Sequence, residues 1–269
     1  SGVIGIGGGS IMDIAKALSL MLTNEGSSTL YQGLNLIKKP GVYHLGVPTI
    51  SGTGAKVSMT AVLKKKKKKL GLKCDWTVFN QVILDPELIA SVPTDWWFYT
   101  GMDTYIHCIE SHYGIKNNAF SLAYGNQALQ LCREVYLNEN SGQTTDNDDK
   151  LMVASLMGGL SLTYSEVGVC HALSYGLSKI LGTRHCLANC IIFQHLQDIY
   201  PIGHAEFMQM INKHKIELPK NLSKQWDDET ISKMALVSYN LPFMWHHAFG
   251  DNYKEIATTD YIKELFKRL

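Results

Sequence analysis

Hydrophobic and polar positions follow two different patterns along this chain, with a change near residue 90. Before that point, short apolar runs typical of strands alternate with helix and turn signals, and the expected strands are 3–6, 43–48, 57–63 and 81–84. After it the apolar spacing is helical, with expected helices at 101–113, 118–137, 148–164, 167–181 and 184–200. Thr94 and Asp95 are expected to cap the first of these helices, and 138–149 to be a polar connection. The pattern predicts an α/β domain over 1–92 and an all-helical domain over 93–269.

The first expected strand ends in a glycine turn, Gly7 to Ser10, and a helix with apolar spacing follows over 11–22. Glycines let a backbone approach a pyrophosphate, and free N–H groups at a helix N-terminus bind its charge. A purely structural turn is the alternative. Residues 47–56 form a second turn after a strand, rich in glycine and in small hydroxylated side chains. Two such turns at strand ends favour a ligand in the crevice of a parallel sheet.

Four residues of the helical part have the chemistry and the spacing of metal ligands. Asp103 and His107 are four residues apart, which places them on one face of a helix. His171 and His185 follow in a second glycine-flanked segment. Apolar neighbours flank His107 and His171, and buried charges need partners or a metal. One carboxylate with three imidazoles suits Fe²⁺ or Zn²⁺, although an Asp four residues before a His is also common on exposed helices.

Composition narrows the class of protein without identifying it. A length of 269 residues with 45% hydrophobic residues suffices for one or two packed units. A formal net charge of +1 argues against a general nucleic-acid binder. No apolar run of about eighteen residues predicts a membrane span, and no basic-apolar leader precedes the first strand. We therefore expect a cytoplasmic protein with neither a nucleic acid nor a membrane as partner.

Cysteine and lysine clusters have simpler interpretations than binding sites. The six cysteines lack a paired C-x-x-C framework, so buried reduced thiols are expected ahead of a Cys-rich zinc site at Cys186 and Cys190. The run Lys64 to Lys69 predicts a solvated hairpin tip, with a basic partner-binding patch as the alternative.

With these residues in view, the sequence resembles the iron-containing (group III) alcohol dehydrogenase family over nearly its whole length. The resemblance implies a metal-dependent oxidoreductase that acts on a small-molecule sugar or alcohol with NAD or NADP, and it leaves a homodimer open. The family's metal would be held by Asp103, His107, His171 and His185, the last two reproducing its fourteen-residue spacing. The motifs that carry the resemblance are Gly7-Gly8-Gly9-Ser10-x-x-Asp13-x-Ala15-Lys16, Pro48-Thr49-x-x-Gly52-Thr53-Gly54, Asp85-Pro86-Glu87-Leu88 and Gly101-Met102-Asp103-x-x-x-His107.

The resemblance also assigns cofactor contacts and a catalytic carboxylate. Asp13 would lie near the cofactor phosphate or the substrate. Gly8, Gly9 and Ser10 would contact the pyrophosphate. Thr49, Ile50 and Thr53 would contact the nicotinamide side, and Lys69 would contact the ribose. The family builds the first half of its nucleotide-binding sheet from βαβ elements ahead of this glycine turn. Without them, the domain over 1–92 is expected to be only a partial Rossmann-like domain.

Two departures from the family pattern bear on mechanism and substrate. Tyr175 stands where many relatives carry a further His, so Tyr175 or a bound water would carry the proton, with packing as the alternative role. Relatives often read Ser-Glu where this chain has Ala55 and Lys56. A substrate other than a simple short alcohol is therefore expected.

Segments 167–178 and 69–75 look most like one branch of the family. That branch oxidises the C8 primary alcohol of 3-deoxy-D-manno-octulosonate to an aldehyde in lipopolysaccharide sugar biosynthesis. Arg184, beside His185, is then a candidate partner for the substrate carboxylate, or else a helix-surface residue. The alternatives are a general NAD(P)-dependent dehydrogenase or aldehyde reductase of small alcohols or diols, a metal-dependent lyase related to dehydroquinate synthase, and a non-catalytic metal- or nucleotide-binding relative.

Overall fold

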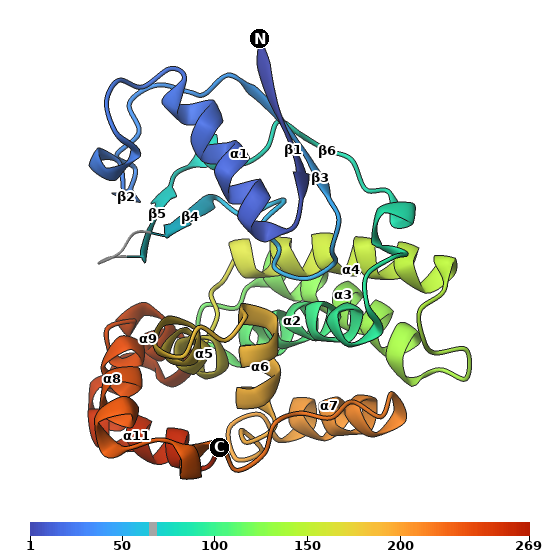
Figure 1. Ribbon diagram of the computed structural model, residues 1–269, viewed down its shortest axis with the longest axis vertical. Helices are drawn as coiled ribbons and strands as arrows, with labels where there is room; N and C mark the ends of the chain where they lie inside the picture. Colours follow the sequence, from blue (N-terminus) through green and yellow to red (C-terminus); the bar gives the residue numbers. More distant parts are fainter. Residues whose placement is uncertain (65–68) are drawn as a thin grey trace.

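The computed structural model describes the backbone of residues 1–64 and 69–269, with side chains for all of these except residues 64, 69 and 70. The chain has two parts (Figure 1), an upper part that holds the strands and a lower part built from helices. The amino end lies at the top of the upper part, and the carboxyl end lies among the helices. This arrangement confirms the expected fold class, an α/β part followed by a helical part.

Three parallel strands form the main sheet of the amino-terminal part. They are β1 (Gly2–Gly7), β3 (Tyr43–Pro48) and β6 (Gln81–Val82), in the order β1-β3-β6. The crossover between β1 and β3 contains α1 (Gly9–Met21), whose buried Met12 and Ala15 pack with Val3 and Phe79. Because β1 and β3 are parallel, their carboxyl ends lie at one edge of the sheet, and both glycine turns begin there.

A second, smaller sheet contains β2 (Gly33–Leu34), β5 (Lys69–Lys73) and β4 (Thr60–Lys64), in that order. β4 and β5 are antiparallel, as the predicted hairpin requires. Residues 65–68 of its predicted solvated tip lie outside the described residues. The strand predicted at 57–63 begins only at Thr60, because two N–H groups of the preceding turn donate to the carbonyl of Gly54.

Beyond the short 3-10 helix η3 (Pro86–Ile89), the described chain is helical. Its helices are α2 (Thr94–Tyr113), α3 (Ala119–Leu137), α4 (Thr145–Thr163), α5 (Val169–Ile180), α6 (His185–Phe193), α7 (Pro201–Lys213), α8 (Asp228–Tyr239), α9 (Pro242–Phe249), α10 (Tyr253–Ile256) and α11 (Thr259–Lys267). α2 is the central element, because residues 97–111 are all buried. A helix buried on every side belongs to the core, so the side chains that α2 carries are held in fixed positions.

Two predicted helix starts are wrong. α4 begins at Thr145, inside the segment predicted as a polar connection, because the hydroxyl of Thr144 accepts a hydrogen bond from the N–H of Asn147 and caps the helix. α2 begins at Thr94 without a side-chain cap. Thr94 and Asp95 are therefore residues of the helix rather than its caps.

The predicted helix end at residue 200 is also wrong, because α6 ends at Phe193. The carbonyl of Gln194 lies 3.0 Å from Nε2 of His204. The imidazole takes the place of the backbone N–H that would continue the helix, and the chain then turns toward α7.

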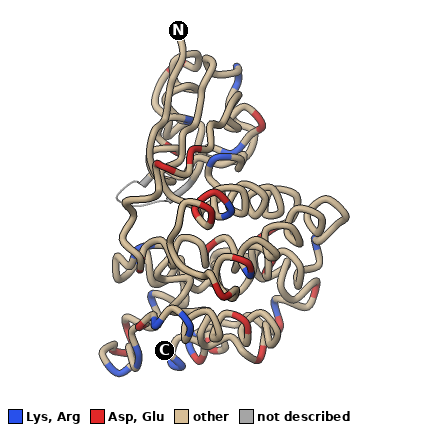
Figure 2. Tube along the Cα trace, turned by 90° about the vertical axis from the view of Figure 1, so that its right-hand side faces the viewer, with Lys and Arg blue, Asp and Glu red and all other residues tan. Residues whose placement is uncertain are grey.

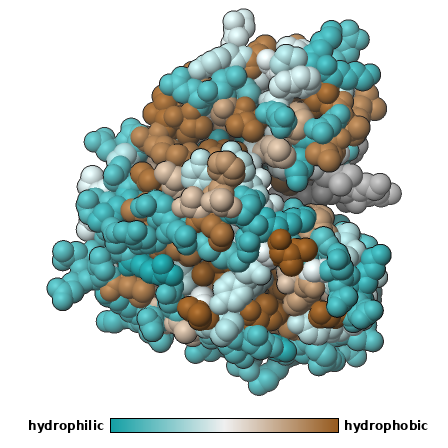
Figure 3. Space-filling model, turned by 180° about the vertical axis from the view of Figure 1, so that it is seen from behind, coloured by the Kyte–Doolittle hydropathy of each residue, from teal (hydrophilic) through white to brown (hydrophobic). Residues whose placement is uncertain are grey.

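The surface differs between the two parts. Charged residues of both signs are interspersed along the helical part (Figure 2), in keeping with a net charge of +1. Hydrophobic residues gather on the rear face of the amino-terminal part (Figure 3). Among the described residues, no helix is both long enough and apolar enough to cross a membrane. All six cysteines are buried and free, which confirms the expected reduced thiols.

Candidate metal centre and nucleotide pocket

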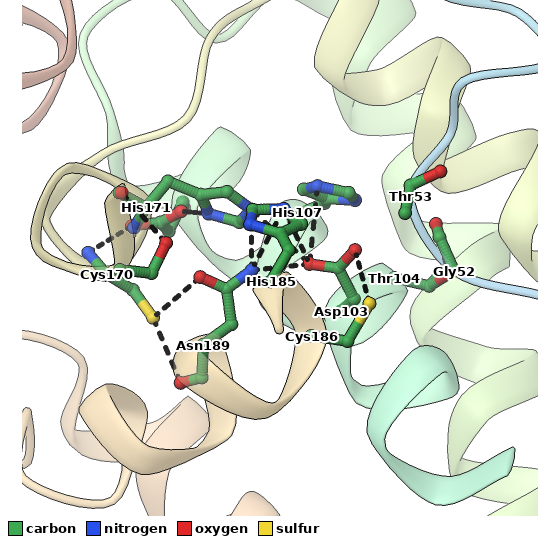
Figure 4. Close-up of polar contacts among 12 residues, drawn as sticks. Gly52, Thr53, Asp103, Thr104, His107, Cys170, His171, His185, Cys186 and Asn189 are labelled. Carbon is green, nitrogen blue, oxygen red and sulfur yellow. Dashed lines mark hydrogen bonds and ion pairs between the residues drawn. The ribbon is translucent and has the colours of Figure 1, made fainter. Parts of the chain in front are cut away.

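Four side chains from three helices converge at one point of the helical part. Asp103 and His107 come from α2, His171 from α5 and His185 from the start of α6. Figure 4 shows them pointing toward one another, and one ligand atom of each lies within 4.8 Å of the others. Oδ1 of Asp103 is 3.5 Å from Nε2 of His171 and 3.7 Å from Nε2 of each of the other two imidazoles. The structure thus brings together the four residues predicted as metal ligands.

These separations fit a shared ion better than hydrogen bonds. A carboxylate oxygen and an imidazole nitrogen that are 3.5 to 3.7 Å apart are too distant for a good hydrogen bond. Two ligands that each lie about 2.1 Å from a tetrahedral ion are about 3.4 Å apart. The residues present therefore fit a divalent metal. The side chain of His185 is 31% exposed against 3% or less for the other ligands, so it marks the open side of the cluster.

Glu110, which the sequence analysis did not single out, orients His171. Its Oε2 makes a short contact with Nδ1 of His171, so Nδ1 carries the proton and Nε2 turns its lone pair toward the cluster. The other oxygen of Glu110 accepts a hydrogen bond from the N–H of Cys170 at 2.6 Å. Glu110 lies three residues after His107 and seven after Asp103, which keeps all three on one face of α2. That spacing is the signal that could have revealed it.

Buried charges give this cluster a preference for a cation. Burial raises the pKa of Asp103, but the neighbouring imidazoles outweigh burial and hold this pKa well below its usual range. Burial also raises the pKa of Glu110, and His171 outweighs it and lowers this pKa. Burial lowers the pKa of His171, yet Glu110 and Asp103 raise it to about 9. Two ionised carboxylates in the interior need a cation, and a divalent ion that displaces a proton meets this need.

Asn189, the second residue that the sequence analysis missed, links the ligands to one another. It lies four residues after His185 on α6, and its Nδ2 donates to Oδ1 of Asp103 at 2.6 Å. The same nitrogen is 3.0 Å from Nε2 of His171 and 3.4 Å from Nε2 of His185. The thiol of Cys186 donates to the other oxygen of Asp103 at 3.4 Å (Figure 4). Asp103 is therefore anchored through both of its oxygens.

The second glycine turn lies directly beside this cluster (Figure 4). Thr104, next to Asp103 on α2, donates its hydroxyl to the carbonyl of Gly52 at 3.1 Å. A Cβ on Gly52 would meet the carbonyl oxygen of Thr100 at 2.6 Å, so a residue without a side chain is needed for this approach. Because Asp103 and Thr104 are neighbours, the ligand cluster and the turn are fixed relative to each other.

The two glycine turns meet at a pocket. A Cβ on Gly9 would lie 2.9 Å from Oγ1 of Thr53, and a Cβ on Gly8 would lie 3.0 Å from Cδ1 of Ile50. The turns therefore touch, and four of the predicted cofactor residues are brought together. The pocket is lined by Gly7, Gly8, Gly9, Met12, Pro48, Ile50, Gly52, Thr53, Ala55 and Lys56.

Two of the remaining predicted cofactor residues, Ser10 and Thr49, are not among the described residues that line this pocket. Ser10 is exposed in the first turn of α1. The N–H of Thr49 donates to the carbonyl of Gly7 at 3.1 Å. The side chain of Lys69 lies outside the described residues. The assignment of individual residues to pyrophosphate, nicotinamide and ribose stays a prediction.

Tyr175 lies beside the cluster, and the charge of Asp13 reaches Tyr175 from another part of the chain. The ring of Tyr175, on α5, lies 5.9 Å from the ring of His185. Burial raises the pKa of Tyr175 to about 12, and the charges of Asp103, Glu166 and Asp13 add to the rise. Asp13, on α1, is therefore close enough to Tyr175 for its negative charge to raise the pKa of the phenol. The catalytic roles of both residues stay a prediction.

Two family models match this chain. The model described as iron-containing alcohol dehydrogenase matches residues 1–86. The model described as the Fe-containing alcohol dehydrogenase family, C-terminal, matches residues 97–241. The first match contains both glycine turns, and the second contains all four residues of the ligand cluster.

Named relatives are similar to this chain over about two thirds of it. The sulfoacetaldehyde reductase of Bilophila wadsworthia is 34% identical over 192 residues, which are 69% of this chain and 49% of that protein. The NAD-dependent methanol dehydrogenase of Bacillus methanolicus is 29% identical over 198 residues, 72% of this chain and 52% of that protein. The chain thus spans about half the length of the curated relatives it matches.

A solved structure shares the fold. The sulfoacetaldehyde reductase of Bifidobacterium kashiwanohense, in complex with NAD⁺, matches with a TM-score of 0.81 at 22% identity. The match covers 98% of this chain and 75% of that chain. The likeness therefore extends through both the strand-bearing and the helical part.

Proposed function

This chain belongs to the iron-containing alcohol dehydrogenase family, and we propose that it interconverts a small primary alcohol and its aldehyde with a divalent metal and NAD or NADP. The observation that carries this proposal is the hydrogen bond from Thr104 to the carbonyl of Gly52. It holds the ligand cluster, through Asp103, beside a turn that lines the pocket. A substrate oxygen at the cluster and a nicotinamide at the turn would then be neighbours, as hydride transfer requires.

The metal would supply Lewis acidity toward the substrate oxygen. Asp103 and the three imidazoles would hold it, and Glu110 would keep His171 in the tautomer that binds. Because His185 is the most exposed ligand, the substrate would enter on its side. Tyr175 lies next to His185, so we assign it the transfer of a proton to or from the substrate oxygen. The negative charge of Asp13 would help to keep this phenol protonated.

The two glycine turns would bind the nucleotide. Glycine backbones and the hydroxyl of Thr53 line the pocket between the turns, and they would face the phosphates and the nicotinamide. We assign the pyrophosphate to Gly8, Gly9 and Ser10, the nicotinamide side to Thr49, Ile50 and Thr53, and the ribose to Lys69.

The relatives support a small substrate. Two of them are named for sulfoacetaldehyde and methanol, both short molecules, so the general small-alcohol alternative has more support than the octulosonate. Arg184, the candidate partner of the octulosonate carboxylate, stacks over the ring of Trp96 at 4.5 Å from its centroid. This packing accounts for Arg184 without a substrate. Oxidation of the C8 hydroxyl of 3-deoxy-D-manno-octulosonate stays a prediction that the named relatives do not support.

The test is nucleotide-dependent turnover by the metal-loaded protein. NADH and NADPH oxidation would be followed with formaldehyde and sulfoacetaldehyde, and NAD⁺ and NADP⁺ reduction with methanol and 3-deoxy-D-manno-octulosonate. We expect turnover of a small substrate, its loss in His185→Ala, and its retention in His246→Ala, which changes an imidazole on α9. Undiminished turnover in His185→Ala, or turnover of the octulosonate alone, would contradict the proposal.

A further inference from the structure

Lys56 is a buried lysine that makes no ion pair with a carboxylate in the described part of the chain. It is 3% exposed, and it lines the pocket between the two glycine turns. Among the described residues, its ammonium has one hydrogen-bond partner, the hydroxyl of Ser155 on α4. Burial lowers the pKa of Lys56 to about 7, and no charged side chain on the turn, on α4 or on α1 adds to this shift. A buried ammonium without a counter-charge is costly.

The position of Lys56 is fixed by a backbone contact. Gly54 has a φ of +64°, and a Cβ there would lie 2.7 Å from Cα of Gly159. The turn therefore packs its backbone on α4. Ser155 lies one helical turn before Gly159, so the two share a face of α4 and Ser155 meets the Lys56 amine. The Ser155 hydroxyl also lies 3.4 Å from the carbonyl of Gly52.

Lys16 shows what a buried lysine with a structural role looks like in the described part of the chain. Its Nζ donates to the carbonyls of Ser58 at 2.7 Å and Thr60 at 3.1 Å, and to the hydroxyl of Ser58 at 3.2 Å. It is not among the residues that line the pocket. Lys56, with one hydroxyl partner at a pocket wall, has N–H donors that no described residue accepts from.

We propose that Lys56 is the counter-charge for a phosphate group of the nucleotide that occupies this pocket. The inference rests on the proposed function and adds a specific cation to it. Phosphate oxygens accept charge-assisted hydrogen bonds from an ammonium, and Lys56 lines the pocket where the two glycine turns meet. An anion beside Lys56 favours its protonated form. Binding of the nucleotide is then coupled to uptake of a proton.

Calorimetry of NADH binding to the metal-loaded protein tests this coupling. Titrations at pH 8 in two buffers with different enthalpies of ionisation give the number of protons taken up. The Lys56 amine is mostly neutral at this pH in the free protein, because its pKa is about 7. We expect an uptake that approaches one proton in the wild type and is absent in Lys56→Met, with affinity about tenfold lower in the variant. Nicotinamide riboside, which has no phosphate, should bind without proton uptake.

Three further variants separate charge from structure. Ser155→Ala removes the hydrogen-bond partner and should keep the proton uptake. Lys56→Arg keeps a permanent charge, so it should bind NADH without proton uptake. If Lys56→Met does not fold, Lys56→Arg takes its place in the test of proton uptake. Lys150→Met removes a cation from α4 outside the pocket and should behave as wild type.

Two results would overturn the inference in distinguishable ways. Equal affinity and equal proton uptake in wild type and Lys56→Met would remove Lys56 from the site and leave the proposed function intact. Absence of NADH and NADPH binding in the metal-loaded wild type would overturn the proposed function together with this inference.

Discussion

The imidazole of His171 can bind a metal through Nε2 only when its proton lies on Nδ1, and Glu110 decides this. Glu110→Gln keeps the size of the side chain and removes the charge that holds the proton in place. We expect metal affinity to fall about ten- to a hundredfold, the usual effect of losing such a partner. Competition with a chromophoric chelator measures it, and Glu139→Gln, at an exposed position, is the control. Equal affinities in wild type and Glu110→Gln would show that the contact does not orient the ligand.

Lys56 makes stability depend on pH. Burial lowers the pKa of Lys56 from its ordinary 10.5 to about 7 in the folded protein, so the unfolded chain binds more protons between these pH values. Stability then rises as pH rises from 7 to 10.5. Lys56→Met does not have the cost of a buried ammonium. Its free energy of unfolding at pH 6 should exceed that of the wild type by on the order of a few kcal/mol. Urea unfolding at pH 6 and pH 10 tests it, because the difference between the proteins should shrink toward pH 10. A difference that does not change with pH would contradict this account.

The four metal ligands could be predicted from their side-chain types and from their spacing in the sequence. Asp103 and His107 share a helix face, and that relation is visible in the sequence. The position of Glu110 on the same helix face was visible in the sequence, but its partner, like the partners of Asn189, is fixed only when α5 and α6 pack beside α2. The contact between Lys56 and Ser155 joins residues 99 positions apart, and no local pattern specifies such a pair.

At the scale of elements, the second turn depends on the close approach of two glycine backbones. Gly54→Ala combines a positive φ with a Cβ only 2.7 Å from Cα of Gly159. A Cβ on Gly182, at a φ of +73°, would have no described atom within 4 Å. Gly182→Ala should cost about 1 to 2 kcal/mol through its φ alone. Gly54→Ala should cost more and should weaken NADH binding, as unfolding and calorimetry would show. Equal costs for the two variants would mean that the turn does not need its contact with α4.

The apolar periodicity predicted which segments are strands and which are helices. It did not predict the residues at which several of them begin or end. α4 extends into a polar segment because Thr144 caps it, and polar residues in the first turn of a helix look like a loop in the sequence. α6 stops at Phe193 because His204, from the next helix, binds the carbonyl of Gln194. A boundary set by a side chain of another element cannot be found from the segment alone.

For the whole molecule, the metal should act as a stabilising ligand, because its four ligands join three helices of the core. An ion present at about a hundredfold excess over its dissociation constant adds about 2.7 kcal/mol. This corresponds to a rise of about 5 to 10 °C in Tm for a chain of this size. Scanning fluorimetry of chelator-treated protein with and without added Fe²⁺ or Zn²⁺ measures it. An equal rise in His185→Ala would place the stabilising ion somewhere else.

The central claim is that Asp103, His107, His171 and His185 bind one metal ion. Anomalous diffraction from crystals of the metal-loaded protein tests this claim most directly. Data collected on both sides of the iron and zinc absorption edges locate and identify a bound ion. We predict one strong peak about 2.0 to 2.2 Å from Oδ1 of Asp103 and from Nε2 of His107, His171 and His185. A peak bound instead by the thiols of Cys186 and Cys190, or no peak at the four ligands, would contradict it.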